Sequence, residues 1–273
     1  MSSRLDGRPL AAEIRAAATE AAAVRAPVLA AVVATDDPGA AWYAGSIAKA
    51  AEATGIELRQ SRLAAHDAAG VLATLDELSA DPGVHGIICL TPLPTGLTLA
   101  EAGEHIAPAK DVDGASPVGL GRLAAGLPAF APATAQAVIE LLRHSETPLE
   151  GADAVVVGRS IVVGKPLAML LLAENATVTI CHTRTRELEE VTRRAGILVA
   201  AAGRAHLLGA RHVRPGAVVI DVGTNEAPDG SMVGDVDTDA VEHMASLVTP
   251  VPGGVGPVTT AVLLRNVVTA AAG

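Results

Sequence analysis

Val-Val-Val-Gly-Arg-Ser-Ile-Val-Val-Gly-Lys-Pro, residues 155–166, is the stretch that decides the fold, and an apolar segment, residues 167–172, follows it. The β-branched run before the first glycine is typical of a buried strand, and the apolar segment after the proline is typical of a helix. The start of such a helix carries unpaired backbone N–H groups and the positive end of the helix dipole, which together bind phosphate. The stretch therefore predicts a strand, a phosphate-binding loop and a helix.

Four residues of this loop are candidates for cofactor binding. Gly158 lets the backbone turn tightly, Ser160 adds a hydroxyl donor and Arg159 adds a positive charge. Gly164 completes the spacing Gly-x-Ser-x-x-x-Gly, which differs from the common dinucleotide-binding spacing Gly-x-Gly-x-x-Gly. The alternative is an ordinary turn between a strand and a helix of an α/β domain.

A second apolar strand, residues 176–181, leads into His-Thr-Arg-Thr-Arg at 182–186. In a dinucleotide-binding fold the adenosine ribose lies at the end of this strand, where an acidic residue binds the free hydroxyls of NAD. This strand ends without an acid. Thr183 and Arg184 offer a hydroxyl and a guanidinium, which suit a ribose phosphate, so the sequence favours NADP over NAD. The alternative for the arginines is the solvated start of a helix.

The composition limits the class of protein. The chain has 273 residues, of which 50% are hydrophobic and three are aromatic, so its core must consist of aliphatic side chains. A net charge of −10 without a basic block argues against nucleic acid or an anionic membrane as a partner. No apolar run approaches the ~18 residues of a membrane span, and no signal peptide is recognisable. Cys89 and Cys181 lie in apolar runs and no cysteine or histidine cluster has metal-site spacing, so we expect a cytoplasmic protein without a metal.

Segments typical of strands and of helices alternate along the chain. This alternation predicts an α/β fold of parallel sheets with helices on both faces. Because the phosphate loop lies in the middle of the chain, the first half is expected to form a separate α/β unit. The expected strands are residues 28–34, 58–63, 86–90, 154–157, 177–181, 197–201 and 217–222, and the expected helices are residues 42–54, 71–79, 132–142, 166–172 and 259–271.

Four further motifs are hard to explain by packing alone. They are Lys-Asp-Val-Asp-Gly at 110–114, Val-Ile-Asp-Val-Gly at 219–223, Gly-Asp-Val at 234–236 and Thr-Pro-Val-Pro-Gly-Gly-Val-Gly-Pro-Val-Thr at 249–259. Together with the Gly-Arg-Ser of the phosphate loop, this set resembles the bifunctional methylenetetrahydrofolate dehydrogenase/methenyltetrahydrofolate cyclohydrolase family. The similarity extends from Leu5-Asp6-Gly7 to the C-terminal helix, and the Pro-Val-Pro-Gly-Gly-Val-Gly-Pro loop is highly specific.

The resemblance implies two α/β domains flanking a cleft. Residues 1–133 and 252–273 would form the folate-binding catalytic domain, and residues 134–251 a Rossmann-type NADP-binding domain. The implied reaction belongs to one-carbon metabolism: hydride transfer to NADP oxidises 5,10-methylenetetrahydrofolate, and the 5,10-methenyl product is then hydrolysed to 10-formyltetrahydrofolate. The resemblance also implies a homodimer whose ligands are tetrahydrofolate derivatives.

Tyr43 and Asp113 match the family's active-site residues. The resemblance implies that the tyrosine ring flanks the folate rings and that the carboxylate accepts hydrogen bonds from the pterin. The simpler interpretations are a surface tyrosine at the start of a helix and an aspartate in a turn. For Asp111 the role of a turn or cap residue is the stronger interpretation.

The later motifs supply the remaining candidates. Pro252, Gly253 and Gly254 would let the backbone approach the folate closely, or would form only a rigid connection. Thr224 would lie on the nicotinamide side, where the family usually has isoleucine. Asp221 is interpreted as a cap at the junction of a strand and a loop, without a part in the reaction.

The chain departs from the family at residues that would handle protons. The family's lysine four positions after the tyrosine is Ile47 here, and the glutamine before the Leu-Pro-Leu-Pro turn is Leu90. Lys49 lies six positions after the tyrosine, about 240° around a helix and away from its face. Further departures are Gly119 in place of asparagine, and Pro-Ala-Thr-Ala at 132–135 in place of Pro-Cys-Thr-Pro.

General acid–base catalysis contributes about 10²–10⁴-fold in rate, and isoleucine transfers no proton. We therefore predict an NADP-dependent dehydrogenase whose cyclohydrolase activity is weak or lost. The alternatives are a fully bifunctional enzyme, a member that acts on another reduced pterin, and a non-catalytic folate- or dinucleotide-binding protein. The intact Gly-Arg-Ser loop argues against the last of these.

Overall fold

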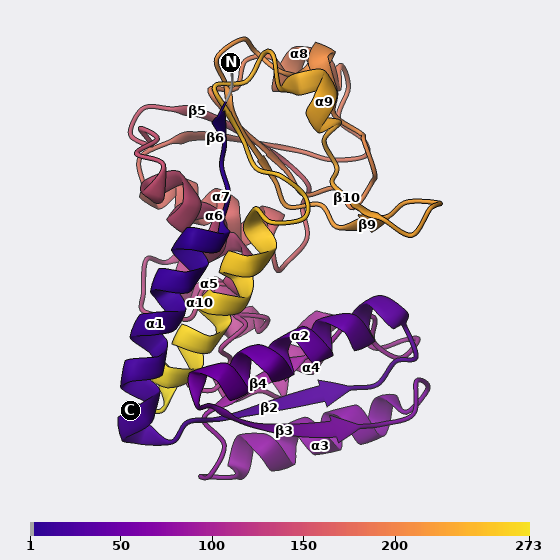
Figure 1. The fold of residues 1–273 in the computed structure, drawn as a ribbon. Coiled ribbons are helices and arrows are strands. Elements are labelled where there is room, and N and C mark those ends of the chain that lie inside the picture. Colours follow the sequence, from indigo (N-terminus) through magenta and orange to yellow (C-terminus); the bar gives the residue numbers. More distant parts are fainter. Residues whose placement is uncertain (1–2) are drawn as a thin grey trace. The chain divides into compact units, whose positions relative to one another are not determined.

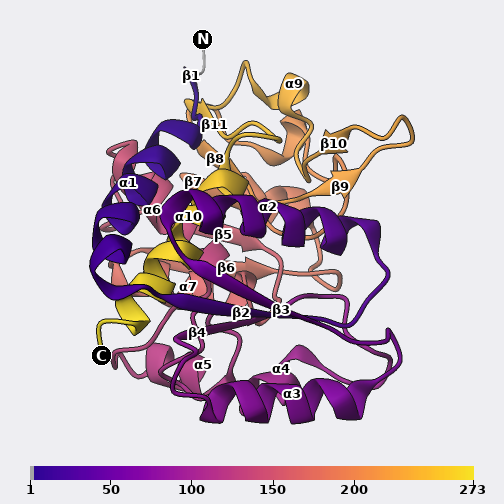
Figure 2. The ribbon, with the colours of Figure 1, turned by 60° about the horizontal axis from the view of Figure 1, so that its bottom comes forward.

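The computed structural model describes residues 3–273, which form two compact units. One unit comprises residues 12–133 and 260–273, and we call it the three-stranded unit after its sheet. The other, the six-stranded unit, comprises the residues up to 11 and residues 134–259. Each is an α/β structure built on a parallel sheet (Figures 1 and 2). The predicted fold class, two α/β domains, is confirmed.

The boundaries of the units differ from those of the predicted domains at two places. Residues 3–11 and 252–259 group with the six-stranded unit. Backbone pairing is the reason, because β1 (Ser3–Arg4) joins the six-stranded sheet beside β11 (Leu247–Val248). In addition, the N–H of Gly7 donates to the carbonyl of Gly253 over 2.9 Å. The roles predicted for the two parts of the chain remain predictions.

The three-stranded sheet has the order β3-β2-β4, with β2 at Val28–Val33, β3 at Glu57–Arg62 and β4 at Gly86–Cys89. Every residue of β2 and β4 is buried, as expected for strands that are covered on both faces. Helices α2 (Pro38–Thr54) and α3 (Ala68–Ala80) lie on opposite faces of the sheet (Figures 1 and 2). Right-handed connections from β2 to β3 and from β3 to β4 require this arrangement.

Helix α2 carries Tyr43, and residues at both of its ends fix its position. The carboxylate of Asp37 accepts a hydrogen bond from the N–H of Ala40 over 2.8 Å, which caps the first turn. Gly55, in the left-handed conformation with φ 76°, ends the helix. The helix therefore begins at Pro38 rather than at the predicted residue 42, because proline is favoured directly after such a cap.

Four further helices contribute to this unit. The unit boundary falls within α1 (Arg8–Arg25) and α10 (Val255–Ala270), whose C-terminal parts lie side by side (Figures 1 and 2). The Arg25 guanidinium donates to the carbonyl of Ala272 over 3.1 Å at that end. Two short helices, α4 (Leu99–Glu104) and α5 (Pro117–Ala124), follow β4.

The six-stranded sheet has the order β1-β11-β8-β7-β5-β6, and all of its strands are parallel. Its longer strands are β5 (Asp153–Val157), β6 (Thr177–Cys181), β7 (Ile197–Ala200) and β8 (Val218–Asp221). The chain runs from β5 to the edge strand β6 and returns to β7 on the other side of β5, so the strand order reverses there. Open parallel sheets bind ligands at the carboxyl ends of strands beside such a reversal.

Shorter elements complete the six-stranded unit. They are α6 (Ala133–His144, which begins at the boundary), α7 (Gly164–Ala173), α8 (Leu188–Thr192), a 3₁₀ turn (Ala210–His212), α9 (Thr238–Val241) and the antiparallel pair β9 (Asn225–Glu226) and β10 (Met232–Val233). Cys89 and Cys181 are buried free thiols, as predicted. Within residues 3–273, no helix combines the length and the apolar content that a membrane span needs.

Candidate active site

The loop after β5 has a backbone that only glycine can form. Gly158 has φ +142°, and a Cβ on it would lie 2.0 Å from the carbonyl oxygen of Ala201 in the loop after β7. A Cβ on Gly164 would lie 2.2 Å from the carbonyl oxygen of Gly158. The two glycines therefore hold the loop tightly closed between the ends of β5 and β7, beside the reversal of strand order. This geometry fits a close approach of backbone to a nucleotide phosphate.

Ser160 uses its hydroxyl oxygen inside this loop. The Oγ atom accepts hydrogen bonds from the N–H groups of Val163 (3.1 Å) and Gly164 (3.4 Å), and its carbonyl accepts from the N–H of Lys165 (3.1 Å). The prediction that the start of α7 offers its N–H groups unpaired was therefore wrong for these three residues. The hydroxyl hydrogen of Ser160 and the exposed guanidinium of Arg159 are the donors suited to a phosphate.

The turn after β6 presents the two residues predicted to bind a ribose phosphate. The hydroxyl of Thr185 accepts from the N–H of His182 over 2.8 Å, and the N–H of Arg184 donates to Nδ1 of His182 over 3.2 Å. These bonds fix the turn, and the side chains of Thr183 and Arg184 are exposed on it. A hydroxyl and a guanidinium on one tight turn suit an anionic group on the ribose.

Two other loops carry predicted residues of the six-stranded unit. Thr224 is exposed, three residues after β8 ends at Asp221. Pro252 is exposed, Gly253 has φ +111°, and the N–H of Gly254 donates to the carbonyl of Pro250 over 2.8 Å. The Pro-Gly-Gly segment is thus a tight turn whose backbone conformation requires glycine.

In the three-stranded unit, Lys110 and Asp111 hold the Lys-Asp-Val-Asp-Gly loop in place by hydrogen bonds. Lys110 donates from Nζ to the carbonyl of Asp81 over 2.6 Å, at the end of α3. The buried carboxylate of Asp111 accepts from the N–H groups of Ala115 and Ser116, each over 2.9 Å, which confirms its interpretation as a structural residue. Both charged residues therefore fasten the loop to neighbouring helices.

The middle and the end of the loop are equally constrained. Val112 is fully buried, and its carbonyl accepts from the side-chain amide of Asn266 in α10 over 2.9 Å. Gly114 has φ +64°, and a Cβ there would lie 2.5 Å from the backbone nitrogen of Pro132. By contrast, no hydrogen bond or ion pair of the Asp113 carboxylate is found among residues 3–273. The loop thus holds one partly buried carboxylate ready for a ligand.

Asp113 interacts electrostatically with Tyr43. Burial, and secondarily the carboxylate of Asp111, raise the pKa of Asp113 to about 7. Burial and the charge of Asp113 raise the pKa of the Tyr43 hydroxyl and of the Cys89 thiol. The structure therefore brings the two predicted catalytic residues, Tyr43 and Asp113, into one electrostatic neighbourhood. It adds Cys89, which the sequence analysis treats only as a residue of an apolar run.

The two positions at which the resemblance leads one to expect polar groups hold buried apolar side chains instead. Ile47, one turn after Tyr43 on α2, is fully buried, and Leu90, directly after β4, is 3% exposed. Lys49 is exposed, in agreement with its predicted position away from the tyrosine face. No proton-transferring side chain therefore occupies either of the two replaced positions.

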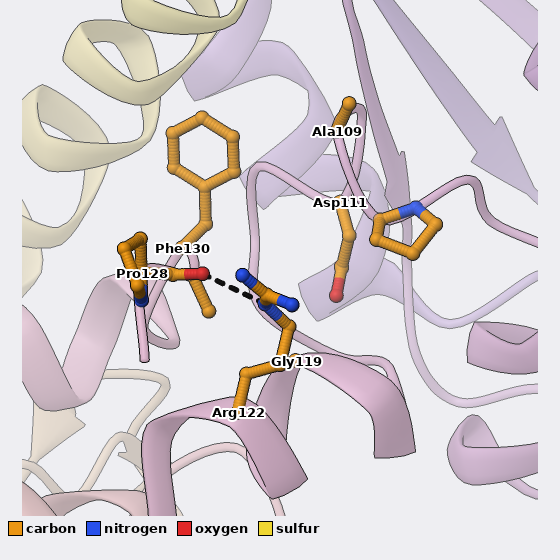
Figure 3. Close-up of a pocket in the computed structure, with 8 residues that line it drawn as sticks. Ala109, Asp111, Gly119, Arg122, Pro128 and Phe130 are labelled. Carbon is orange, nitrogen blue, oxygen red and sulfur yellow. Dashed lines mark hydrogen bonds between the residues drawn. The ribbon is translucent and has the colours of Figure 1, made fainter. Parts of the chain in front are cut away.

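A cavity next to the Lys-Asp-Val-Asp-Gly loop is not the predicted folate site (Figure 3). Its volume is about 410 Å³, and neither Tyr43 nor Asp113 lines it. The guanidinium Nε of Arg122 donates to the carbonyl of Pro128 over 2.8 Å across it (Figure 3). Its lining residues are Pro108, Ala109, Asp111, Gly119, Arg122, Pro128, Ala129 and Phe130. We assign this cavity no part in the reaction proposed below.

Family models match almost the whole chain. The model described as the catalytic domain of tetrahydrofolate dehydrogenase/cyclohydrolase matches residues 5–113, and the model of its NAD(P)-binding domain matches residues 132–273. The bifunctional protein FolD of Nocardia farcinica is 56% identical to this chain, over 98% of this chain and 96% of its own length. The prediction of a nicotinamide-dinucleotide-binding domain is thereby confirmed.

Solved structures agree with this assignment. The bifunctional enzyme FolD, a methylenetetrahydrofolate dehydrogenase/cyclohydrolase from Campylobacter jejuni, has a TM-score of 0.95 at 39% identity and covers 100% of this chain and 99% of its own. The corresponding enzyme of Trypanosoma brucei, in a complex with NADP and an inhibitor, has a TM-score of 0.94 at 34% identity and covers 99% of this chain and 97% of its own. The chain belongs to the tetrahydrofolate dehydrogenase/cyclohydrolase family.

Proposed function

We propose that the protein oxidises 5,10-methylenetetrahydrofolate to 5,10-methenyltetrahydrofolate with NADP, and that its methenyltetrahydrofolate cyclohydrolase activity is weak or lost. The observation that carries the proposal is the combination of a ligand-ready carboxylate at Asp113 with two buried apolar side chains, Ile47 and Leu90, at the proton-handling positions. The substrate site would thus retain its means of binding folate and lack its means of activating water.

For the folate, Tyr43 and Asp113 have the required chemistry. A carboxylate without a protein hydrogen bond accepts two adjacent N–H groups of a pterin, and an aromatic ring with a polar tip packs against a flat heterocycle. The rigid fastening of the loop by Lys110 and Asp111 keeps Asp113 in place without a ligand. This preorganisation favours binding because little conformational freedom is lost.

For the cofactor, the residues of the six-stranded unit fit a dinucleotide phosphate. The Gly158 and Gly164 turn leaves no room for a side chain, and Ser160 and Arg159 supply donors to the pyrophosphate. Thr183 and Arg184 would bind the 2′-phosphate that distinguishes NADP from NAD. When bound, NADP supplies the hydride acceptor, and the chain's own groups contribute binding and orientation.

A fully bifunctional enzyme is the second candidate, because the relatives that resemble this chain are named bifunctional. The two candidates differ in one reaction only, the hydrolysis of the methenyl compound. A member acting on another reduced pterin is a third candidate, favoured by the more apolar wall at Ile47 and Leu90.

Reduction of NADP on addition of 5,10-methylenetetrahydrofolate to the purified protein tests the proposal. We expect substrate-dependent reduction that is saturable in both reactants. A protein that binds NADP but reduces none with this substrate, and reduces it with another reduced pterin, would support the third candidate instead.

Arg184 is expected to make the protein prefer NADP over NAD. Arg184→Ala is expected to raise KM for NADP by about 10–100-fold, because a hydrogen bond to a charged group contributes ~1.5–3 kcal/mol. KM for NAD should stay unchanged, since NAD lacks the phosphate. Steady-state kinetics with both cofactors measure the change, and Arg186→Ala, an exposed arginine on the same segment, is the matched control. Equal effects on NADP and NAD would contradict the assignment.

The raised pKa of Asp113 predicts a pH dependence. Below about pH 7 the free enzyme holds this carboxyl protonated, and a protonated carboxyl no longer accepts both pterin hydrogen bonds. kcat/KM for the folate should therefore be constant above pH 7 and fall below it, by about tenfold per pH unit, since kcat/KM reports groups of the free enzyme. In the Asp113→Asn variant, kcat/KM should not fall below pH 7, which would verify that Asp113 causes the fall. If kcat/KM of this variant falls as in the wild type, Asp113 is excluded as the cause.

We also propose that the protein is a homodimer. β6 is an edge strand of the six-stranded sheet, Ile180 in it is 40% exposed, and Leu172 in α7 is 66% exposed. Exposed apolar side chains on an edge strand and on the helix that contacts it are suited to covering by a second copy. Light scattering should give twice the chain mass, and Leu172→Glu with Ile180→Glu should give the monomer mass. A monomeric wild-type protein would contradict this proposal.

A further inference from the structure

Asp221, at the end of β8, is a buried carboxylate that holds two loops together. It is 1% exposed, and its Oδ1 atom accepts hydrogen bonds from the N–H groups of Gly223 (2.9 Å) and Asp235 (3.0 Å). Its Oδ2 atom accepts from the N–H of Val236 over 2.9 Å. Its own N–H donates to the hydroxyl of Thr249 over 2.7 Å, just before the Pro-Gly-Gly turn. One side chain thus joins the segments that follow β8 and β10.

Asp235 is a second buried carboxylate and extends the network to the loop after β7. It is fully buried, and its Oδ2 atom accepts from the N–H groups of Ala202 (2.6 Å) and Gly203 (3.0 Å). Its Oδ1 atom accepts from the N–H of Arg204 (2.8 Å) and the side-chain amide of Asn225 (3.0 Å). Within residues 3–273, no salt bridge offsets either carboxylate, so these N–H groups stabilise both charges.

Two glycines make the network possible. A Cβ on Gly223 would lie 2.3 Å from Oδ1 of Asp235, and a Cβ on Gly234 would lie 1.8 Å from Oδ2 of Asp221. The carboxylate of Asp235 therefore occupies the space that a side chain at position 223 would need, and the carboxylate of Asp221 occupies the space that a side chain at position 234 would need. Loops joined this closely cannot shift independently of each other.

The joined loops carry or contact two predicted cofactor positions. Ala201, next to the residues held by Asp235, is the residue against which Gly158 of the phosphate loop packs. Thr224 directly follows Gly223, the residue held by Asp221. The spacing between the phosphate loop and the Thr224 loop is thus set by hydrogen bonds to the two carboxylates. Burial raises the pKa of Asp221 to about 6, so its carboxylate is ionised, and a strong acceptor, at neutral pH.

We propose that Asp221 and Asp235 are positioning residues for the nicotinamide half of the cofactor, acting through the backbone N–H groups of the loops after β7 and β8. The proposal rests on the proposed function, because it assumes that the six-stranded unit binds NADP. It does not involve the turn at Thr183 and Arg184, which follows β6 and which neither carboxylate contacts.

Calorimetric titration with two ligands separates positioning from general support of the fold. NADP carries both halves of the cofactor, whereas adenosine 2′,5′-bisphosphate carries only the adenosine half. Asp221→Asn keeps the size of the side chain but turns an NH₂ group toward backbone N–H groups, so one hydrogen bond at least is lost. We expect a Kd for NADP about tenfold higher or more, and a Kd for adenosine 2′,5′-bisphosphate unchanged within about twofold.

Two further variants make the test decisive. Asp237→Asn, a change of the same kind at the cap of α9, should alter neither Kd, because asparagine caps a helix as well as aspartate. Thr249→Val removes the acceptor for the Asp221 N–H at nearly constant volume. It should raise the Kd for NADP, by less than Asp221→Asn does, and leave the Kd for adenosine 2′,5′-bisphosphate unchanged. This variant carries the test if Asp221→Asn does not fold. Equal weakening of both ligands, or no change for NADP, would overturn the inference. A wild-type protein that binds neither ligand would contradict the proposed function itself.

Discussion

Replacing Ile47 with lysine and Leu90 with glutamine is expected to raise the rate of methenyltetrahydrofolate hydrolysis by about 10²–10⁴-fold, the usual contribution of general acid–base catalysis. Position 47 lies one turn after Tyr43 and is fully buried. Apolar surroundings lower the pKa of a lysine toward neutrality, which suits a group that must exchange a proton during hydrolysis. The glutamine at position 90 would orient the amine by a hydrogen bond.

The double variant needs controls for folding and for side-chain size. Ile47→Met with Leu90→Met changes the shape of the same wall without adding a proton donor, and its hydrolysis rate should equal that of the wild type. A buried lysine costs stability, so thermal unfolding and the dehydrogenase rate are measured on every variant. A folded double variant that retains dehydrogenase activity and hydrolyses no faster would show that these two positions are not what limits hydrolysis.

Asp113→Asn is expected to lower kcat/KM for 5,10-methylenetetrahydrofolate by about 10²–10³-fold. A hydrogen bond to a charged group contributes ~1.5–3 kcal/mol, the carboxylate is proposed to accept two of them, and an amide places a donor where the pterin also donates. The loop itself should stay folded, because Lys110, Asp111 and the Val112 carbonyl make its hydrogen bonds and, within residues 3–273, none is found for the Asp113 carboxylate.

The effect at Asp113 is checked by steady-state kinetics with each substrate varied. KM for NADP should be unchanged, since the residues proposed to bind the cofactor lie in the other unit. Asp67→Asn is the matched control, because Asp67 caps α3 and asparagine serves equally well as a cap. An Asp113→Asn protein with wild-type kcat/KM would exclude the assigned role.

The long elements could be predicted from the sequence because their own residues specify them. The apolar run that ends at Val157 has no helical periodicity, and Gly55 ends α2 by a conformation that other residues rarely adopt. The two-residue strands could not be predicted in this way. β11 is a strand only because residues 3–4 and 218–219 pair with it, and such pairing depends on chain segments far apart in the sequence.

In the candidate site, too, some features could be predicted from the sequence and others could not. The tight turn at Gly158 and Gly164 was predictable from the glycine spacing, and the structure gives each glycine a close neighbour that excludes a side chain. Their part in cofactor binding stays a prediction. The use of the Ser160 hydroxyl within its own loop was not predictable, since it depends on the path of the loop. The contacts of Asp221 beyond those of a simple cap could not be predicted, because its partners Asp235 and Val236 lie in a different loop. The signal that could have revealed this network is a recurring pattern of aspartate within two residues of glycine, at 221–223 and 234–235.

Loss of 5,10-methenyltetrahydrofolate, supplied alone to the purified wild-type protein, tests the central claim most directly. The same preparation must first reduce NADP with 5,10-methylenetetrahydrofolate, which establishes that the folate site is intact. We predict that the methenyl compound then disappears at the rate seen without enzyme, because Ile47 and Leu90 activate no water. Enzyme-dependent hydrolysis at a rate comparable to the dehydrogenase reaction would contradict the account and establish a bifunctional enzyme.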